Sequence, residues 1–248
     1  MKTEWFPGLG EILSVGAFYK KFDKPAELSV NTQGNTSYYL KSSDRAKVYG
    51  LEFELRKSLG FIADKKILNN LTAYGNLTLQ KSEVIGTYLI ADPDPDLPNL
   101  SVPSKQSRPM YGQTPYLINA GIQYSGEKLG LNLVYNKSGY KTYIVGALQT
   151  DVEYERPREQ LDAQVSYRFL KKRLEVKVNA GNLLNQASAF YLNIGSYENN
   201  PDYVGGTGDI SDALRLKPGF TDRYEEGDRI VFSQKFGRTY STSITWNF

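Results

Sequence analysis

Three carboxylates stand at alternate positions in one proline-rich stretch of the chain: Asp92, Asp94 and Asp96. Carboxylate oxygens are ligands that Ca²⁺ prefers, so this spacing allows a calcium site. The stretch lacks the glycine turn and the distal glutamate of a calcium loop, and its prolines favour an extended, solvated segment. We therefore predict no metal site and no cofactor.

Two acids, Glu52 and Glu54, could form acid–base pairs with two bases, Arg56 and Lys177. A catalytic acid–base pair needs two groups that converge on one substrate atom. On one face of extended strands these charges are better explained as groups that satisfy one another in water. The chain has no cysteine and no histidine, which excludes thiolate nucleophiles, Cys/His metal sites and Ser-His-Asp triads. We predict no catalytic residue and no enzymatic activity.

Basic residues cluster at Arg156-Pro157-Arg158 and at Lys171-Lys172-Arg173. The second cluster is typical of a solvated turn. The chain has 30 Lys and Arg against 27 Asp and Glu, and this near balance predicts no nucleic-acid partner.

Tyrosines are frequent in the irregular segments, and aromatic rings there could stack on a sugar or a siderophore. The alternative, which we favour, is that they pack the loops against one another. No substrate-binding residue is assigned, and the tyrosines concerned are Tyr38, Tyr39, Tyr191, Tyr197 and Tyr203.

The elements that position these residues are β-strands, because apolar and polar residues alternate with a period of two. In the last ten residues, Tyr240, Ile244 and Trp246 alternate with Ser241, Ser243 and other small polar residues. There is no run of 18 apolar residues that would suggest a transmembrane helix. Strands are predicted over residues 12–22, 46–59, 71–81, 116–124, 129–136, 161–169, 174–184 and 229–248, after a strand stub at 1–6.

The predicted connections alternate strictly between long and short. Transmembrane β-barrels have this asymmetry, with short periplasmic turns and long extracellular loops, and most predicted strands have the roughly 9–11 residues that a tilted spanning strand needs. Aromatic residues near the strand ends fit the two girdles of such a barrel. We predict an all-β, antiparallel transmembrane barrel segment of about eight strands in the outer membrane. The long loops are expected at 29–44, 85–114, 137–159 and 185–227.

Several stretches resemble the TonB-dependent outer-membrane receptors, particularly those of Bacteroidetes. These stretches follow one another over nearly the whole chain and include residues 13–22, 47–57, 108–121, 154–158, 182–185 and 237–241. The resemblance implies that residues 1–248 are the C-terminal portion of a large barrel, in which outer-membrane lipid surrounds the strands. The plug domain, the segment that binds TonB and a signal peptide have no counterpart among these residues, so the expectation is a fragment.

In this family the whole protein carries out energised uptake of a nutrient such as a siderophore or an oligosaccharide. The resemblance therefore implies TonB as a partner, through the missing N-terminal parts, and allows a surface lipoprotein as a second partner.

Three alternatives remain open at this point. A complete small barrel of eight strands with a structural or adhesive role would require the first and last strands to pair. An outer-membrane enzyme would need an unusual carboxylate or lysine site, because histidine is absent. A soluble β-sandwich that binds a ligand would not partition into detergent. The predicted membrane assignment further requires Asp162, Gln164, Ser166 and Arg168 to face the lumen.

Overall fold

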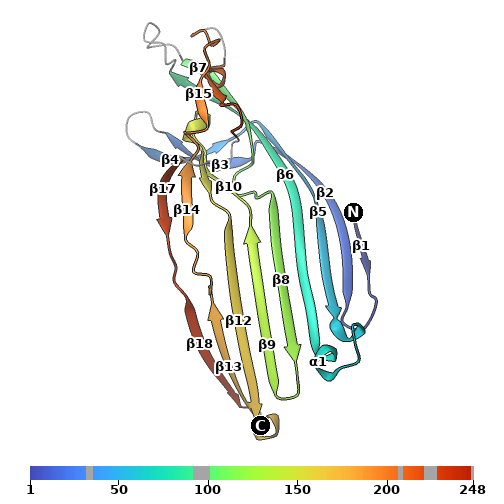
Figure 1. The fold of residues 1–248 in the computed structure, drawn as a ribbon. Helices are drawn as coiled ribbons and strands as arrows, with labels where there is room; N and C mark the ends of the chain where they lie inside the picture. Colours follow the sequence, from blue (N-terminus) through green and yellow to red (C-terminus); the bar gives the residue numbers. More distant parts are fainter. Residues whose placement is uncertain (32–35, 92–100, 206–208, 221–227, 247–248) are drawn as a thin grey trace.

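The structure, a computed structural model, describes residues 1–31, 36–91, 101–205, 209–220 and 228–246. Its main element is one antiparallel sheet in which each long strand lies beside the next along the chain (Figure 1). This arrangement confirms the predicted all-β, antiparallel fold class. In order across the sheet the strands are β1 (Lys2–Trp5), β2 (Ile12–Asp23), β5 (Arg45–Ser58), β6 (Leu71–Ala91), β8 (Tyr116–Ser125), β9 (Leu129–Ser138), β12 (Arg158–Phe169), β13 (Leu174–Gly181) and β18 (Thr239–Trp246), and β7 (Ser101–Arg108) pairs with the far end of β6.

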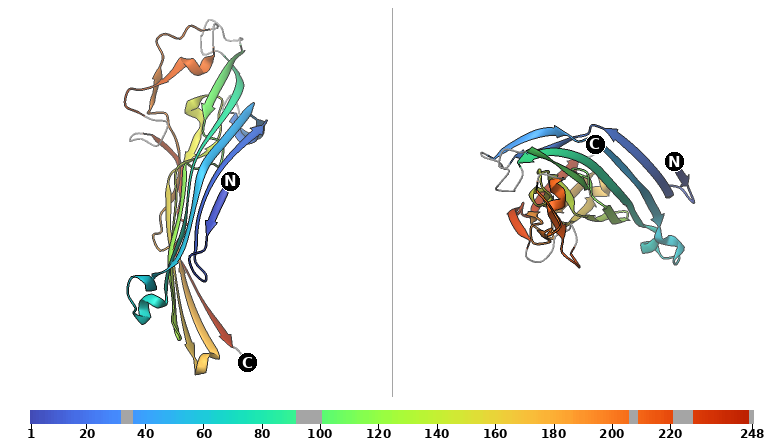
Figure 2. Two further views of the ribbon diagram at one scale, coloured as in Figure 1. Left: turned by 90° about the vertical axis from the view of Figure 1, so that its right-hand side faces the viewer. Right: turned by 90° about the horizontal axis from the view of Figure 1, so that it is seen from above.

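The sheet is strongly curved, and it is open (Figure 2). Strands β1 and β18 form its two edges and do not pair with each other in the described part of the chain. A closed barrel of eight strands would need that pairing. The molecule is therefore a segment of a barrel wall.

Two of the predicted strands differ from the observed ones, whereas the others agree within three residues at each end. Strand β6 continues ten residues beyond the predicted end at 81, to Ala91. The predicted strand at 229–248 is two strands, β17 (Arg229–Gln234) and β18, which belong to different sheets. They are separated at Gly237, whose φ of +80° lies in the left-handed region that favours glycine.

A second, four-stranded sheet holds β10 (Lys141–Ile144), β11 (Glu153–Glu155), β14 (Ser188–Leu192) and β17, in this order. Each of its strands is next in sequence to one of β9, β12, β13 and β18, so the small sheet prolongs the large one at the same end (Figure 1). Asn182 and Asn185, both at positive φ, separate β13 from β14, and asparagine tolerates this conformation better than most residues.

The segments 29–44, 85–114, 137–159 and 185–227 were predicted as long loops from their polar composition, yet they contain strands. These strands pair mostly within the same segment, and β11 with β14 joins two segments. The segments contain β3 (Ala26–Asn31) paired with β4 (Ser37–Ser42), β15 (Tyr197–Asn199) paired with β16 (Leu214–Leu216), the end of β6, β7, β10, β11 and β14.

Helical structure is short and lies in the connections. The single α-helix of the described residues is α1 (Lys66–Asn69), and no helix among them is long and apolar enough to cross a membrane. The 3₁₀ turns are η1 (Leu59–Phe61), η2 (Gln149–Asp151), η3 (Leu170–Lys172) and η4 (Ile210–Ala213).

The continuous register of β5 with β6 defines two faces of the sheet. We call the face that carries Leu51 and Leu79 the outward face, and the face that carries Asn76 and Thr78 the inward face. The end of the sheet with the short β8–β9 and β12–β13 turns is the short-turn end, and the opposite end is the long-loop end. On the outward face apolar side chains are exposed along most strands, among them Leu13, Val15, Leu51, Phe53, Leu55, Leu131, Leu133, Val165, Val178 and Ile244.

Candidate functional site

Polar side chains form rows across the inward face. Gln164 Nε2 donates to Asn179 Oδ1 at 2.6 Å, and Asn179 Nδ2 donates to Ser241 Oγ at 3.1 Å. In another row, Asn119 Nδ2 donates to Asn76 Oδ1 at 2.6 Å. Such rows suit a water-filled interior, because each amide can bond both its neighbour and water. The residues predicted to face the lumen alternate with Val165 and Tyr167 and so lie on this face: Asp162, Gln164, Ser166 and Arg168.

The acids and bases singled out in the sequence do not converge. Glu54 lies 3.6 Å from Lys2 Nζ, and Arg56 lies over the ring of Tyr74. Lys177 is on β13, and four strands separate it from Glu52 on β5. These four side chains therefore do not form a convergent acid–base pair.

A buried ion pair joins two segments at the long-loop end. Arg108, at the end of β7, donates from Nη1 to Glu27 Oε1 at 3.0 Å and from Nη2 to Glu27 Oε2 at 2.7 Å. Both side chains are 1% exposed. This two-point geometry matches the planar guanidinium to the planar carboxylate and is the strongest form of such a pair.

Further donors complete the coordination of the Glu27 carboxylate. Ser43 Oγ donates to Oε2 at 2.6 Å, and the backbone N–H of Tyr111 donates to Oε1 at 2.8 Å. Arg108 Nη2 also donates to Tyr88 Oη at 3.3 Å. Burial alone would raise the pKa of Glu27, but the hydrogen bonds and charge of Arg108, with the bonds from Ser43 and Tyr111, hold that pKa below its ordinary value.

The register explains why Arg108 can reach a buried partner. Arg108 is opposite Val84 in the β6–β7 pair, and Val84 is opposite Ala46 in the β5–β6 pair. These pairings place Arg108 on the inward face. At the long-loop end this face is dry, because its side chains are shielded from solvent: Ala46, Val48, Val84, Tyr88, Ser104 and Gln106 are buried.

The β3–β4 hairpin covers this dry face. It runs crosswise to the long strands instead of prolonging β2 and β5 (Figure 1). Its strand β3 reaches the segment after β9, where the N–H of Val30 donates to Val145 O at 2.8 Å and the N–H of Val145 donates to Leu28 O at 3.0 Å. The hairpin therefore crosses the inward face from β5 to β10, and Glu27 and Arg108 fasten it there.

Strand β7 contacts the same region from its own side. Gln106 Nε2 donates to the carbonyl oxygen of Ala147 at 2.6 Å, and Ser104 Oγ donates to the same oxygen at 2.6 Å. The N–H of Lys105 donates to both carboxylate oxygens of Asp209, at 2.7 and 2.9 Å. Segments far apart in the sequence thus form one cluster, which we call the loop cluster: β3, β4, β7, β10 and residues 145–147 and 209–213.

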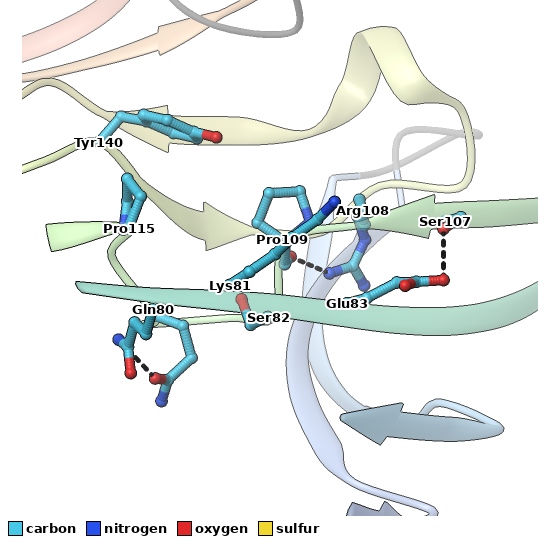
Figure 3. A pocket seen from close by; sticks show the side chains of 10 residues that line it. Gln80, Lys81, Ser82, Glu83, Ser107, Arg108, Pro109, Pro115 and Tyr140 are labelled. Carbon is cyan, nitrogen blue, oxygen red and sulfur yellow. Dashed lines mark hydrogen bonds between the residues drawn. The ribbon is translucent and has the colours of Figure 1, made fainter. Parts of the chain in front are cut away.

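A hollow of about 630 Å³ opens in the wall of the sheet beside Arg108, and residues of both faces line it, among them Gln80 of the inward face and Lys81 and Glu83 of the outward face. It lies where β6 changes partner from β7 to β8, because β7 ends at Arg108 and β8 begins at Tyr116. Gln80 and Tyr140 lie on opposite sides of it (Figure 3). Gln80 Nε2 donates to Gln113 Oε1 at 3.1 Å, and both side chains belong to the lining of the hollow. The walls present amide, hydroxyl and charged groups together with one aromatic ring, so they could hydrogen-bond a polar ligand.

Of the five tyrosines singled out in the sequence, Tyr197 is half-buried on β15, and the other four divide into two groups. Tyr191 is fully buried and stacks on Tyr154 with ring centroids 5.7 Å apart, and Tyr203 packs against Ile210. These two pack the loops, as favoured above. Tyr38 and Tyr39 on β4 are instead exposed, and they remain candidates for contact with a ligand.

Two features singled out in the sequence remain, the lysine-rich turn and the three alternating aspartates. Lys171 and Lys172 form the β12–β13 turn at the short-turn end and are exposed. Asp92, Asp94 and Asp96 lie outside the described residues. Among the described residues, no group of acidic side chains could hold a metal ion.

Sequence reasoning assigned no role to Glu27 or Arg108. Arg108 begins one of the stretches that carry the family resemblance, and Glu27 is a single carboxylate between apolar residues of β3. Both features were visible, but 81 residues separate the two side chains, so nothing local indicated that they pair.

Comparison with known proteins agrees with this architecture. The family described as TonB dependent receptor-like, beta-barrel matches residues 1–183. Two solved structures of mutant ferric enterobactin receptors from Pseudomonas aeruginosa resemble the chain at 15% identity, with TM-scores of 0.49 and 0.50. The alignments cover the whole of this chain and 30% of each receptor chain. The likeness to the receptor structure with a TM-score of 0.50 shows the fold alone. A comparison with curated proteins found no match.

The outward face is apolar and exposed, the inward face is polar, and the long loops gather at one end. These are the features of a membrane barrel whose long loops are extracellular. The family match covers most of the chain, and that family comprises receptors and transporters rather than enzymes. The chain belongs to the TonB-dependent receptor family and forms part of the β-barrel of an outer-membrane protein of that family.

Proposed function

We propose that the whole protein takes up a scarce nutrient across the outer membrane with energy delivered through TonB. In this proposal the described strands are the C-terminal portion of the barrel wall, and the loop cluster holds the ligand at the cell surface. The open sheet, and the 30% of a solved receptor that the chain spans, support a role as one part of a larger barrel.

The observation that carries the proposal is the crossing of the inward face by the β3–β4 hairpin. A structural barrel needs no ordered loops over its lumen, whereas a receptor must hold ligand-contacting groups in fixed positions above it. The buried Glu27–Arg108 pair provides this fixation, and Arg108 also lines the polar hollow that Gln80 and Tyr140 border.

The class of ligand follows from the exposed groups. Tyr38 and Tyr39 offer aromatic faces, and the hollow offers amides and hydroxyls. These groups suit a ligand rich in rings and hydroxyls, such as a ferric siderophore or an oligosaccharide.

The test is uptake by cells that carry the full-length protein. Accumulation of labelled ferric siderophores and oligosaccharides is measured in paired strains with and without TonB. We expect one compound to accumulate in a TonB-dependent manner, and a Gln80→Ala/Gln113→Ala variant to accumulate it more slowly. Equal accumulation of small solutes in both strains would instead show a passive pore.

A closed eight-stranded barrel with an adhesive role gains no support from this structure. That reading depends on contact between the first and last strands, and within the described residues β1 pairs with β2 and β18 pairs with β13 alone.

A further inference from the structure

The outward face changes character abruptly at the extracellular ends of β2 and β5 and at the middle of β6. Tyr19, Tyr49 and Lys81 form one row across these strands, and Lys21, Lys47 and Glu83 form the next row towards the outside. Arg45 follows one row further out. Nearer the short-turn end, the same face carries exposed Val15, Leu51, Phe53 and Leu55.

The two tyrosines mark the depth of this change. Tyrosine is enriched where the hydrocarbon of a bilayer meets its headgroups, because its ring is apolar and its hydroxyl is polar. Tyr19 and Tyr49 are directly opposite each other and both are exposed. Side chains in the next rows outward therefore lie at the depth of the outer-leaflet headgroups.

These rows carry four positive charges, on Lys21, Arg45, Lys47 and Lys81, against two negative charges, on Glu83 and on Asp23, which is directly opposite Arg45. Glu83 is already occupied, since Lys47 Nζ lies 2.7 Å from it and Ser107 Oγ donates to it. Lys21, Arg45 and Lys81 are exposed, and none of the three makes an ion pair within the described residues.

Lys21 and Lys47 are also directly opposite each other in the β2–β5 pair. Like charges in this arrangement destabilise a strand pair. The Glu83 carboxylate already offsets the charge of Lys47, so Lys21 is the cation of this row that a bound anion would neutralise. A hollow of about 350 Å³ lies at this place, and Tyr19, Lys21, Arg45 and Lys47 are among the residues that line it.

We propose that this basic patch (Lys21, Arg45, Lys47 and Lys81) binds the phosphate groups of an anionic lipid in the outer leaflet. The tyrosines below contact the upper part of the acyl region, and the cations above neutralise the phosphates. The patch faces the outside of the barrel wall, and its binding of lipid can be measured without the ligand that the receptor transports.

The experiment is native mass spectrometry of the full-length protein, purified in detergent and titrated with diphosphorylated lipid A or with its dephosphorylated form. The variant Lys21→Gln/Lys47→Gln/Lys81→Gln should bind the phosphorylated lipid at least about ten-fold more weakly than the parent, because each lysine near an anionic lipid surface contributes appreciably. The variant with arginine at the same three positions should bind as the parent does.

The matched control is Lys65→Gln/Lys128→Gln/Lys172→Gln, which removes the same charge from exposed positions at the short-turn end. It should change the affinity by no more than about two-fold, since these lysines lie at the other membrane surface. Equal binding by the parent and the glutamine variant of the patch would overturn the proposal. So would equal binding of the dephosphorylated lipid, because attachment would then come from the acyl chains alone.

Discussion

Strands β5 and β6 pass through two environments, and the polarity of their faces reverses between them. Below Tyr49, the outward residues Leu51 and Leu55 are apolar and the inward residues Asn76 and Thr78 are polar. Above Tyr49, the outward residues Lys47 and Glu83 are charged, and the inward residues Val48 and Val84 are buried. The strands keep the same register throughout.

This reversal divides the strands into a lower half, below the Tyr49 row, and an upper half, above it. In each half the polarity of a face matches what covers that face. Lipid lies outside the lower half and the lumen lies inside it. Above the Tyr19–Tyr49–Lys81 row, headgroups and then water lie outside, and the β3–β4 hairpin lies inside. Because strand side chains alternate strictly, one pair of strands can serve both environments if the sequence changes its apolar phase at the boundary. The Tyr19–Tyr49–Lys81 row is that boundary.

The largest expected effect is in the upper half, from the substitution Arg108→Met. It leaves the Glu27 carboxylate buried without its partner, which typically costs about 3–5 kcal/mol. Hydrogen exchange of β3 and β4 should accelerate strongly, whereas β8 and β9 should keep their protection. The control Arg168→Met breaks the more exposed pair with Glu175 and should cost about 1 kcal/mol or less. Equal effects of the two substitutions would contradict the distinction between the halves.

A smaller effect is expected in the lower half, from the substitution Phe53→Arg. Phe53 lies two rows below Tyr49 on the outward face, and a charge placed on the lipid face near the membrane centre costs about 2–4 kcal/mol. The preceding residue, Glu52, lies on the inward face, so Glu52→Arg should be tolerated. Urea unfolding of the full-length protein in lipid vesicles measures both variants. If both were equally destabilised, the assignment of the faces would be wrong.

A still smaller loss is expected from Val84→Thr, which buries a hydroxyl group beneath the hairpin without changing the side-chain shape. A buried hydroxyl without a partner costs about 1–3 kcal/mol. The same substitution at Val165, on the exposed outward face of β12, serves as the control. Hydrogen exchange of β3 should report a loss for Val84→Thr only. Unchanged exchange there would show that the hairpin does not seal this face.

The smallest expected effect is that of pH on the hairpin. Because the pKa of Glu27 is lowered in the folded protein, the stabilisation is complete above its unfolded value of about 4.3 and is lost as the pH falls through the lower folded value. The loss should be seen as faster exchange of β3 in acid. In Glu27→Gln this added pH dependence should disappear, and its persistence would assign the effect to another group.

Much of the lower half could be predicted from the sequence. The alternation in Leu161–Phe169 and Leu129–Asn136 is local, and the membrane requires it to be complete, so the strands and their faces could be recognised one at a time. The upper half could not be predicted in this way. Segments such as 29–44 and 185–227 are mostly polar, and composition alone suggested loops.

The sequence by itself determined which face of each spanning strand meets lipid, because that property repeats every second residue and needs no distant partner. Only the tertiary structure decided that β6 continues to Ala91, that β17 and β18 are two separate strands, and that the β3–β4 hairpin crosses the sheet. These features depend on contacts such as Glu27 with Arg108, across 81 residues, and Val30 with Val145. Such contacts form only after the sheet has brought the segments together, so local residue patterns contain no signal for them.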